Sequence, residues 1–509
     1  MTAHHPPAGA RIMLGFHGTR ASVELAELLH ETEARGVILF ARNIVDAAQT
    51  RALIEEIRGL VPWPLLLAVD QEGGAVVRVA RGATVFPGNM ALGAADSVEL
   101  AERQGRASGR QLAAMGFDLN LAPVVDLQTN PANPGIGIRS LGAELARAAP
   151  LAEALVRGHA EAGVSCCLKH FPGKGAASLD AHRDLPVLEL SLAQFRHPHL
   201  AIFEHLFARC PRIAVMTSHV CVTGLDPEWP ATLSAHVVRD VLRGELGFGE
   251  LLLTDDLEMG AIVKRSGIGT AALRAIQAGH DMILVCHEAT RQREAAAALA
   301  EALEDGRIDA DEHRAAVARI ERYSARQRGA PPVDRADGDA VAVEIAQRAV
   351  HVFADPRGLL PLHAGQRIVA LAFRPRSIVG VEEADAGGFE AALRSALAGA
   401  GLPQVEVLPL DLDGPAPSAP ETLRHAERVL LFTWDARGQA RVREWLQLVC
   451  REASERLIVV HLRNPFDQAL VPADVTSLTA FGYQTAQLRA LADVLGGRAT
   501  ARGRMPAPL

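Results

Sequence analysis

The sequence has little of what marks membrane, secreted or nucleic-acid-binding proteins. No stretch approaches the roughly 18–20 uninterrupted apolar residues that cross a bilayer, and residues 1–11 lack the basic and apolar segments of a secretory signal. Basic residues number 52 against 60 acidic ones, the net charge is -8, and no tract is rich in Lys or Arg. Nucleic-acid binders usually carry such a basic footprint. We therefore expect a cytoplasmic location, no membrane partner and no nucleic-acid partner.

Cysteine is also scarce and follows no recognisable pattern. None of the six residues has Cys-x-x-Cys or paired Cys/His spacing, and most have apolar neighbours. Free cysteines of this kind are commonly buried and reduced, so the sequence predicts core thiols and no metal site. The six are Cys166, Cys167, Cys210, Cys221, Cys286 and Cys450.

What is present is a 509-residue chain, long enough for two domains, with a regular α/β pattern in its first part. Short apolar runs alternate with stretches of helical periodicity such as 23–33, 98–115 and 291–303. Continuous hydrophobicity indicates strands buried on both faces, as in a parallel sheet covered by helices. We expect an α/β fold with a (β/α)8 TIM-type barrel over residues 1–325. The eight runs are 12–16, 36–40, 65–70, 119–126, 165–171, 213–219, 251–256 and 282–285.

A second, smaller unit follows a polar stretch rich in Gly and Pro. Residues 326–340 show no apolar period and are predicted to be a linker. Residues 341–509 then combine an expected helix at 341–352 with further apolar runs, which predicts a doubly wound α/β sandwich domain. This part has no phosphate-binding glycine motif, so a nucleotide role is unsupported. The expected strands are 368–373, 405–408, 429–433, 457–462 and 478–481.

Polar side chains fall at the ends of the apolar runs in the first domain. In a parallel barrel all these ends meet at one rim, where barrel enzymes carry their active sites. Residues far apart in sequence are therefore expected to share one pocket. They are Asp70, Asp126, Lys169, His170, His219, Asp255 and Asp256.

Asp255 and Asp256 close a fully apolar run. Side chains alternate along a strand, so one carboxylate can face the barrel axis and act as a nucleophile. The alternative is that both residues only cap the following helix.

The segment 168–186 carries a Lys169-His170 pair, a Gly/Pro-rich loop, and then Asp180-Ala181-His182. A carboxylate two residues from an imidazole can orient it and support proton transfer near neutral pH. A solvated loop histidine is the alternative.

Two glycine-containing segments add further candidates. Asp70 runs into a Gly73-Gly74 turn followed by Arg78, and Arg139 lies between Gly137 and Gly142. Glycine lets the backbone approach a ligand closely, and Asp70 can accept hydrogen bonds from hydroxyl groups. A plain turn or a solvated loop remains open for each.

Together these motifs resemble glycoside hydrolase family 3, and most of all its NagZ-like β-N-acetylglucosaminidase branch. The resemblance covers residues 12–286, and the C-terminal part is similar to the second domain of two-domain members, though less specifically. The motifs are Lys169-His170-Phe171-Pro172-Gly173, Asp180-x-His182 with Asp184-Leu185-Pro186, Asp70-Gln71-Glu72-Gly73-Gly74, Arg139-Ser140-x-Gly142, Asn120-x-Ala122-Pro123-Val124-x-Asp126 and Thr254-Asp255-Asp256-Leu257-x-Met259.

The resemblance implies a retaining exo-β-N-acetylglucosaminidase acting on cell-wall muropeptide fragments, with no cofactor and no metal. Asp255 would be the nucleophile and His182 the acid/base, with Asp180 as its orienting partner. The terminal sugar of the small-molecule glycoside would be held by Asp70, Arg78, Arg139, Lys169 and His170. With only two Tyr and four Trp, the chain favours a small pocket over a long aromatic-lined cleft.

The loop bearing His182 departs from the pattern of the family, which commonly has His at position 174, Asp-Thr at 176–177 and Ser at 181. Here these positions are Lys174, Ala176, Ala177 and Ala181. A lysine cation near His182 would tend to lower the imidazole pKa. We expect an altered acceptor or aglycone preference, or a shifted pH optimum.

Three other functions stay open. A β-glucosidase of the same family usually carries a carboxylate acid/base in its second domain and lacks the Asp-x-His loop, which counts against it. A phosphorylase would use phosphate in place of water. A non-catalytic sugar-binding protein would need neither Asp255 nor His182. The natural aglycone, the role of the second domain and the oligomeric state are not predicted.

Overall fold

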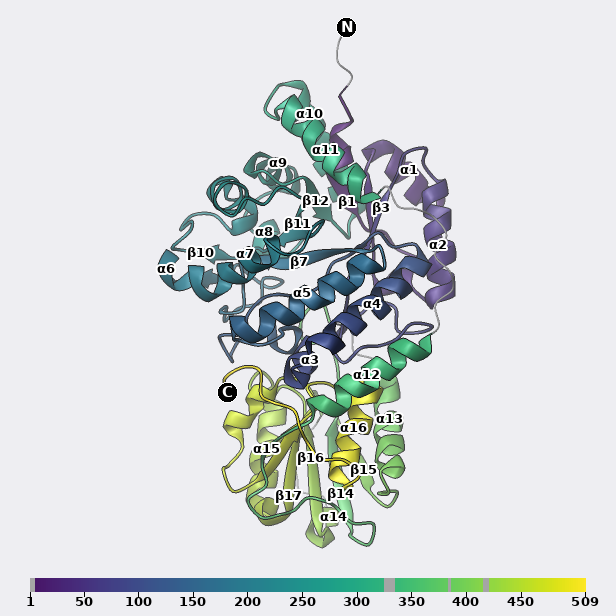
Figure 1. The fold of residues 1–509 in the computed structure, drawn as a ribbon, viewed down its shortest axis with the longest axis vertical. Helices are drawn as coiled ribbons and strands as arrows, with labels where there is room; N and C mark the ends of the chain where they lie inside the picture. Colours follow the sequence, from purple (N-terminus) through teal and green to yellow (C-terminus); the bar gives the residue numbers. More distant parts are fainter. Residues whose placement is uncertain (1–4, 325–334, 383–385, 415–420) are drawn as a thin grey trace.

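The first part of the chain is a closed barrel of eight parallel strands (Figure 1). The computed structural model describes residues 5–324, 335–382, 386–414 and 421–509. Helices surround the barrel, which confirms the predicted fold class. In chain order the strands are β1 (Ile12–Leu14), β2 (Gly36–Leu39), β3 (Leu66–Val69), β6 (Leu119–Asn120), β7 (Ser165–Phe171), β9 (Ala214–Thr217), β11 (Leu252–Asp256) and β12 (Met282–Val285).

The continuous apolar runs form strands because both of their faces are buried. In β3, Leu66 and Ala68 belong to the cluster that fills the barrel interior. Leu67 and Val69 alternate with them and join the cluster between the strands and the outer helices. Successive side chains point to opposite faces of the strand, so both sets are removed from water.

Helices follow the strands, and residues that favour helix ends mark the limits of the longest one. The long helix α4 (Val98–Met115) begins where the Ser97 side chain accepts a hydrogen bond from the Leu100 N–H and ends at Gly116, which has a φ of 99°. It packs against α5 (Leu145–Glu161). The other large outer helices are α1 (Val23–Thr32), α2 (Ala47–Gly59), α7 (Ala201–Phe207), η6 (His236–Glu245), α9 (Ile268–Ala278), α10 (Ala289–Glu304) and α11 (Ala310–Ser324).

The predicted strand 119–126 is wrong in length. Regular pairing stops at Asn120, and only an isolated bridge between Val124 and Lys169 follows. Pro123 has no backbone N–H and cannot continue the ladder. The irregular segment still brings Asp126 alongside the end of β7, where it hydrogen-bonds His170.

The C-terminal part contains a six-stranded sheet in the order β13-β18-β17-β16-β14-β15. All pairs are parallel except β13 with β18. Helices α13 (Ala386–Gly399), α15 (Ala440–Ala453) and α16 (Thr485–Leu495) accompany the sheet (Figure 1). The strands are β13 (His351–Ala354), β14 (Ile368–Phe373), β15 (Glu406–Leu410), β16 (Arg428–Thr433), β17 (Leu457–His461) and β18 (Thr476–Thr479).

The sequence prediction was wrong around the start of this second unit. Residues 335–340, expected in the linker, form the first turns of α12 (Arg335–Ala349). The expected helix 341–352 ends at Ala349, and its last residues enter β13, which pairs with β18. The rest of the expected linker lies outside the described residues.

Helix α12 is the main contact between the two parts, and Figure 1 shows it lying along the barrel helices α3 (Asn89–Ala95) and α4. It also packs against α16 of the second unit. The Thr84 hydroxyl donates to Asp339 at 2.8 Å, and Arg103 forms an ion pair with Glu344 at 2.9 Å. The barrel and the sheet therefore share a packed interface that includes polar pairs.

Among the helices in the described ranges, none combines the length and the apolarity needed to cross a bilayer. All six cysteines are free thiols, five of them buried and Cys450 partly exposed. Burial raises the pKa of Cys166 and Cys286 well above the ordinary value, so these two thiols stay protonated.

Candidate active site

A cavity of about 450 Å³ opens at the carboxyl ends of the barrel strands. This is the rim at which the strand-end residues were expected to meet. All five predicted sugar-binding residues line the cavity, together with His182 and Asp255, while Asp180 lies behind His182. Its polar lining comprises Arg42, Asp70, Arg78, Arg139, Lys169, His170, Lys174, His182, Asp255, Asp256, Glu258 and His287.

Two of the strand-end residues do not line the cavity but support residues that do. Asp126 is buried behind His170 and accepts a hydrogen bond from its Nδ1–H at 2.7 Å. His219 is buried next to β11, where its Nε2–H donates to the Asp256 carbonyl at 2.9 Å. The sequence therefore found both positions but gave no indication of their supporting roles.

Glu72 joins two of the predicted sugar-binding cations and was missed as a site residue. Its carboxylate accepts two hydrogen bonds from the Arg139 guanidinium, at 2.8 and 2.9 Å, and lies 2.6 Å from Lys169 Nζ. Burial alone would raise the pKa of Glu72, but the two adjacent cations outweigh it and lower this pKa to about 2. One carboxylate thus fixes both cations at the cavity floor.

Asp70 and Arg78 form the next part of this polar wall. Lys169 Nζ donates to Asp70 Oδ1 at 2.6 Å, and the Arg78 guanidinium lies 3.7 Å from Asp70 Oδ2. Arg78 also donates to the carbonyl of Val381 at 2.9 Å, a contact that reaches into the C-terminal part of the chain. The carboxylate oxygens therefore face two cations, and both groups line the cavity.

His170 is held as a neutral side chain. Burial, followed by the nearby Lys174 and Arg139, lowers the pKa of its imidazole well below the ordinary value. Its partner Asp126 is fully buried, and this burial raises the pKa of its carboxyl to about 6. Asp126 also accepts from the backbone N–H of Lys174 at 2.6 Å, so one carboxylate fixes both His170 and the start of the following loop.

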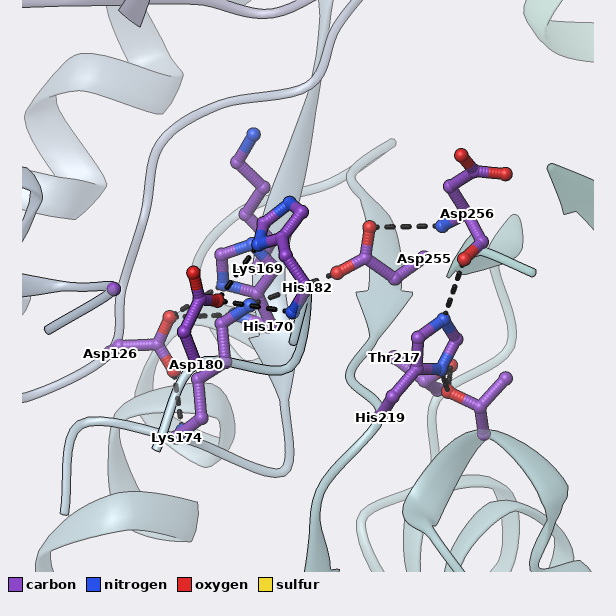
Figure 2. A network of polar contacts seen from close by, with 12 residues as sticks. Asp126, Lys169, His170, Lys174, Asp180, His182, Thr217, His219, Asp255 and Asp256 are labelled. Carbon is purple, nitrogen blue, oxygen red and sulfur yellow. Dashed lines mark hydrogen bonds and ion pairs between the residues drawn. The ribbon is translucent and has the colours of Figure 1, made fainter. Parts of the chain in front are cut away.

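Asp255 faces the cavity from the end of β11. Its Oδ1 accepts from the Asp256 backbone N–H at 2.9 Å, and its Oδ2 lies 3.7 Å from Lys174 Nζ. Burial would raise the pKa of Asp255, but Lys174, His219 and His182 together lower it. In Figure 2 this carboxylate points toward the side of the site that carries His182.

Both oxygens of the Asp256 carboxylate already have partners within the protein. Its Oδ1 accepts from the N–H groups of Glu258, at 3.1 Å, and Cys286, at 3.3 Å. Its Oδ2 lies 3.1 Å from His287 Nε2. Of the two adjacent carboxylates, Asp255 is therefore the one available to a ligand.

The Asp180–His182 dyad predicted from sequence is present. His182 Nδ1–H donates to Asp180 Oδ1 at 2.8 Å, and the His182 backbone N–H donates to the same oxygen at 3.2 Å. Burial opposes the ionisation of Asp180, but these interactions with His182 lower its pKa to about 2. Asp180 is thus an anion at neutral pH and fixes one tautomer of the imidazole.

The loop that bears the dyad is fixed at its start by close packing. A Cβ on Gly175 would lie 1.8 Å from the Leu127 carbonyl oxygen, so only glycine fits there. Lys174 is 9% exposed at its side chain and its ammonium lies on the Asp255 side of the cavity. The sequence prediction that Lys174 acts on His182 stays a prediction, while the ion pair found here is with Asp255.

Residues from the C-terminal part complete the cavity, which no sequence signal indicated. Gly380 and Val381 line it, and a Cβ on Gly380 would lie 3.1 Å from Cδ2 of His182. The second unit therefore contacts the dyad directly. In the part of the chain that the structure describes, no group of three His, Cys, Asp or Glu side chains is arranged to hold a metal ion.

A parallel barrel that gathers a carboxylate and a carboxylate-supported imidazole in one pocket at the carboxyl ends of its strands has the arrangement of a barrel enzyme acting on a small ligand. Residues 11–323 match the family model "Glycosyl hydrolase family 3 N terminal domain". This chain belongs to glycosyl hydrolase family 3.

Individual relatives agree with this assignment. A β-hexosaminidase from Pseudomonas aeruginosa (strain LESB58) is 40% identical over 293 residues, which cover 57% of this chain and 86% of that protein. The solved structure of a glycoside hydrolase family 3 β-N-acetylglucosaminidase from Paenibacillus sp. str. FPU-7 is 33% identical, with a TM-score of 0.91 over 99% of this chain and 98% of that chain. A fungal multi-domain family 3 β-N-acetylglucosaminidase is 28% identical with a TM-score of 0.89, over 99% of this chain and 60% of that chain.

Proposed function

We propose that this glycoside hydrolase is a retaining exo-β-N-acetylglucosaminidase in which Asp255 is the nucleophile and His182 the acid/base. The observation that carries the proposal is that both side chains line one cavity of about 450 Å³, with Asp180 bonded to the far nitrogen of the His182 ring. The β-hexosaminidase and β-N-acetylglucosaminidase relatives support cleavage of the β-glycosidic bond of an N-acetylated sugar.

In the first step Asp255 Oδ2 attacks the anomeric carbon and forms a glycosyl ester, while the bond to the leaving oxygen breaks. The lowered pKa of Asp255 supports this role, because the nucleophile must be ionised. Nδ1 of His182 is occupied by Asp180, so Nε2 is the atom that gives the leaving oxygen its proton. Water then attacks the anomeric carbon and gives a proton to Nε2, the bond from this carbon to Asp255 breaks, and the sugar leaves with its original anomeric configuration.

The terminal sugar is held in this proposal by Asp70, Arg78, Arg139, Lys169 and His170. Asp70 accepts hydrogen bonds from hydroxyl groups, whereas the cations and the neutral imidazole donate to them or to the acetamide oxygen. The buried Glu72 supports this set because it holds Arg139 and Lys169 in fixed positions.

We further propose that the natural substrates are N-acetylglucosaminyl muropeptides or related small glycosides in the cytoplasm. A cavity of about 450 Å³ has the volume of a site for a small ligand. Six free thiols, five of them buried, support a reducing compartment.

The direct test is hydrolysis of 4-nitrophenyl N-acetyl-β-glucosaminide, with the anomeric configuration of the first product followed by NMR. We expect retention by the wild type and no turnover by Asp255→Ala. His182→Ala should lose less activity on substrates with activated leaving groups than on natural substrates. Inversion of configuration, or normal turnover by Asp255→Ala, would refute the assigned roles.

Phosphorolysis is a second candidate because cations gather near the proposed nucleophile. Lys174 Nζ is 3.7 Å from Asp255, and the proposed acid/base is an imidazole rather than a carboxylate that would repel an anionic acceptor. Turnover is to be measured with and without inorganic phosphate. A sugar 1-phosphate as the main product would favour the phosphorylase, and its absence would leave hydrolysis.

A further inference from the structure

The C-terminal part of the chain touches the candidate active site at two places. The segment 378–382 follows β14, and its Gly380 packs against the His182 ring. The Val381 carbonyl of the same segment accepts a hydrogen bond from the Arg78 guanidinium. Residues Arg463 and Asn464, which follow β17, touch the barrel loop 133–139 that carries Arg139. The first contact therefore ends on the proposed acid/base and on one sugar-binding residue, and the second ends on the loop that carries another, Arg139.

A single buried side chain joins these two contacts. Arg463 is 1% exposed at its side chain and donates to Glu382 Oε1 from Nε at 3.0 Å and from Nη2 at 2.6 Å. The same Nη2 donates to the Pro134 carbonyl at 3.3 Å in the barrel loop. Arg463 thus bridges segment 378–382 and loop 133–139.

Glu382 connects Arg463 to the segment 378–382, which packs against His182. Its other oxygen, Oε2, accepts from the Ile378 backbone N–H at 3.2 Å, and its own N–H donates to the Val379 carbonyl at 3.0 Å. The carboxylate therefore closes the turn that presents Gly380 and Val381. Because the side chain is only 3% exposed, water gives little competition for the ion pair with Arg463.

Asn464 secures the barrel loop from the same side. Its Oδ1 accepts from the Ile138 N–H at 3.2 Å, next to Arg139, and its Nδ2 donates to Asp435 Oδ1 at 3.1 Å. A Cβ on Gly137 would lie 2.1 Å from Asn464 Oδ1, so the loop backbone packs directly on this side chain. Arg463 Nη1 also lies 3.3 Å from Asp435, which ties both residues to one carboxylate.

We propose that Arg463 is a positioning residue through which the second domain sets the active-site geometry. It acts on His182 and Arg78 through Glu382 and the Gly380 turn, and on Arg139 through loop 133–139. The proposal goes beyond the proposed function, since it assigns a task to the domain that contains neither the nucleophile nor the acid/base.

The test compares Arg463→Met and Arg463→Lys with the matched control Arg357→Met. Arg357 forms an exposed pair with Asp474 in the same domain and lies outside this network. Two substrates separate the roles: the 4-nitrophenyl N-acetyl-β-glucosaminide, whose leaving group needs little protonation, and the methyl glycoside, which needs it fully. Hydrogen exchange in peptides covering 133–139 and 378–382 is measured in parallel.

We expect Arg463→Met to lower kcat/KM about 100-fold on the methyl glycoside and about tenfold on the nitrophenyl glycoside, because displacements of about 1 Å far from the chemistry have effects of this size. KM should rise on both substrates, since Arg78 and Arg139 lose support. Arg463→Lys should fall between wild type and Arg463→Met, and Arg357→Met should match wild type. Exchange at 133–139 and 378–382 should be faster in both Arg463 variants.

Gly380→Ala provides a variant with the ion pair intact. The added methyl group would push on Cδ2 of His182, so kcat on the methyl glycoside should fall while KM changes little. The positioning role would be overturned if Arg463→Met and Gly380→Ala each lost as much activity on the nitrophenyl glycoside as on the methyl glycoside. Unchanged hydrogen exchange in peptides 133–139 and 378–382 of the Arg463 variants would also overturn it. Inactivity of the wild type toward both glycosides would instead refute the proposed function, while the exchange comparison would still decide the role of Arg463.

Discussion

The buried Glu72 offers the sharpest test of the charge arrangement at the cavity floor. Glu72→Gln keeps the shape of the side chain but removes the negative charge between Arg139 and Lys169. The carboxylate lies 2.8 Å from one cation and 2.6 Å from the other, and both cations are nearly inaccessible to water. The variant therefore leaves two buried positive charges with one fewer anion between them.

The expected loss follows from the pKa of Glu72, which the two cations lower from an ordinary 4.5 to about 2 against the effect of burial. At 1.36 kcal/mol per unit this corresponds to about 3 kcal/mol of folding free energy at neutral pH. Removing one partner of a buried ion pair typically costs about 3–5 kcal/mol, which agrees in size. Because the folded pKa is depressed, this stabilisation is present above about pH 4.5 and is lost as the pH falls toward 2.

The assay is urea unfolding of wild type and Glu72→Gln from pH 7 down to the lowest pH at which both remain folded. We expect a difference in unfolding free energy of about 3 kcal/mol at pH 7 that shrinks steadily below about pH 4.5. KM should also rise at neutral pH. Asp474→Asn, which breaks an exposed pair, should leave the unfolding free energy nearly unchanged. A difference between wild type and Glu72→Gln that stays constant with pH would refute the reasoning.

Other changes test the catalytic groups. Lys174→Met should move the acidic limb of the kcat/KM profile to higher pH, because Lys174 lowers the pKa of Asp255; an unmoved limb would contradict this. Asp180→Asn should lower kcat on the methyl glycoside about 10²–10⁴-fold, measured at a fixed pH, and full activity would argue against the dyad. Dialysis against a metal chelator should leave turnover unchanged, since the proposed mechanism uses no metal, and a loss restored by a divalent cation would overturn that expectation.

Most of the barrel could be predicted because its strands are buried on both faces. That burial requires apolar runs such as Leu66–Val69 and Met282–Val285, and the runs are visible without a structure. The prediction failed where local sequence and tertiary pairing disagree. Residues 351 and 352 were expected to end the helix 341–352, but they lie in β13, which pairs with β18.

The candidate site was predicted in part for a similar reason. Asp70, Lys169 and Asp255 stand at strand ends, so the topology of a parallel barrel brings them together. Glu72 lies three residues past the end of β3, and its part in the site depends on Lys169 from β7 and on Arg139 from the loop 133–139. Gly380 and Val381 belong to another domain and carry no reactive group, so no local pattern could mark them.

The sequence by itself determined the order of elements, the closed barrel and the chemical types gathered at its rim, because hydrophobic periodicity and strand ends are local properties. Only the tertiary structure decided which carboxylate of the pair at 255 and 256 is available, which cations share Glu72, and how Arg463 bridges segment 378–382 and loop 133–139. These outcomes depend on distances between segments remote in the chain, and such distances are set by packing rather than by neighbouring residues.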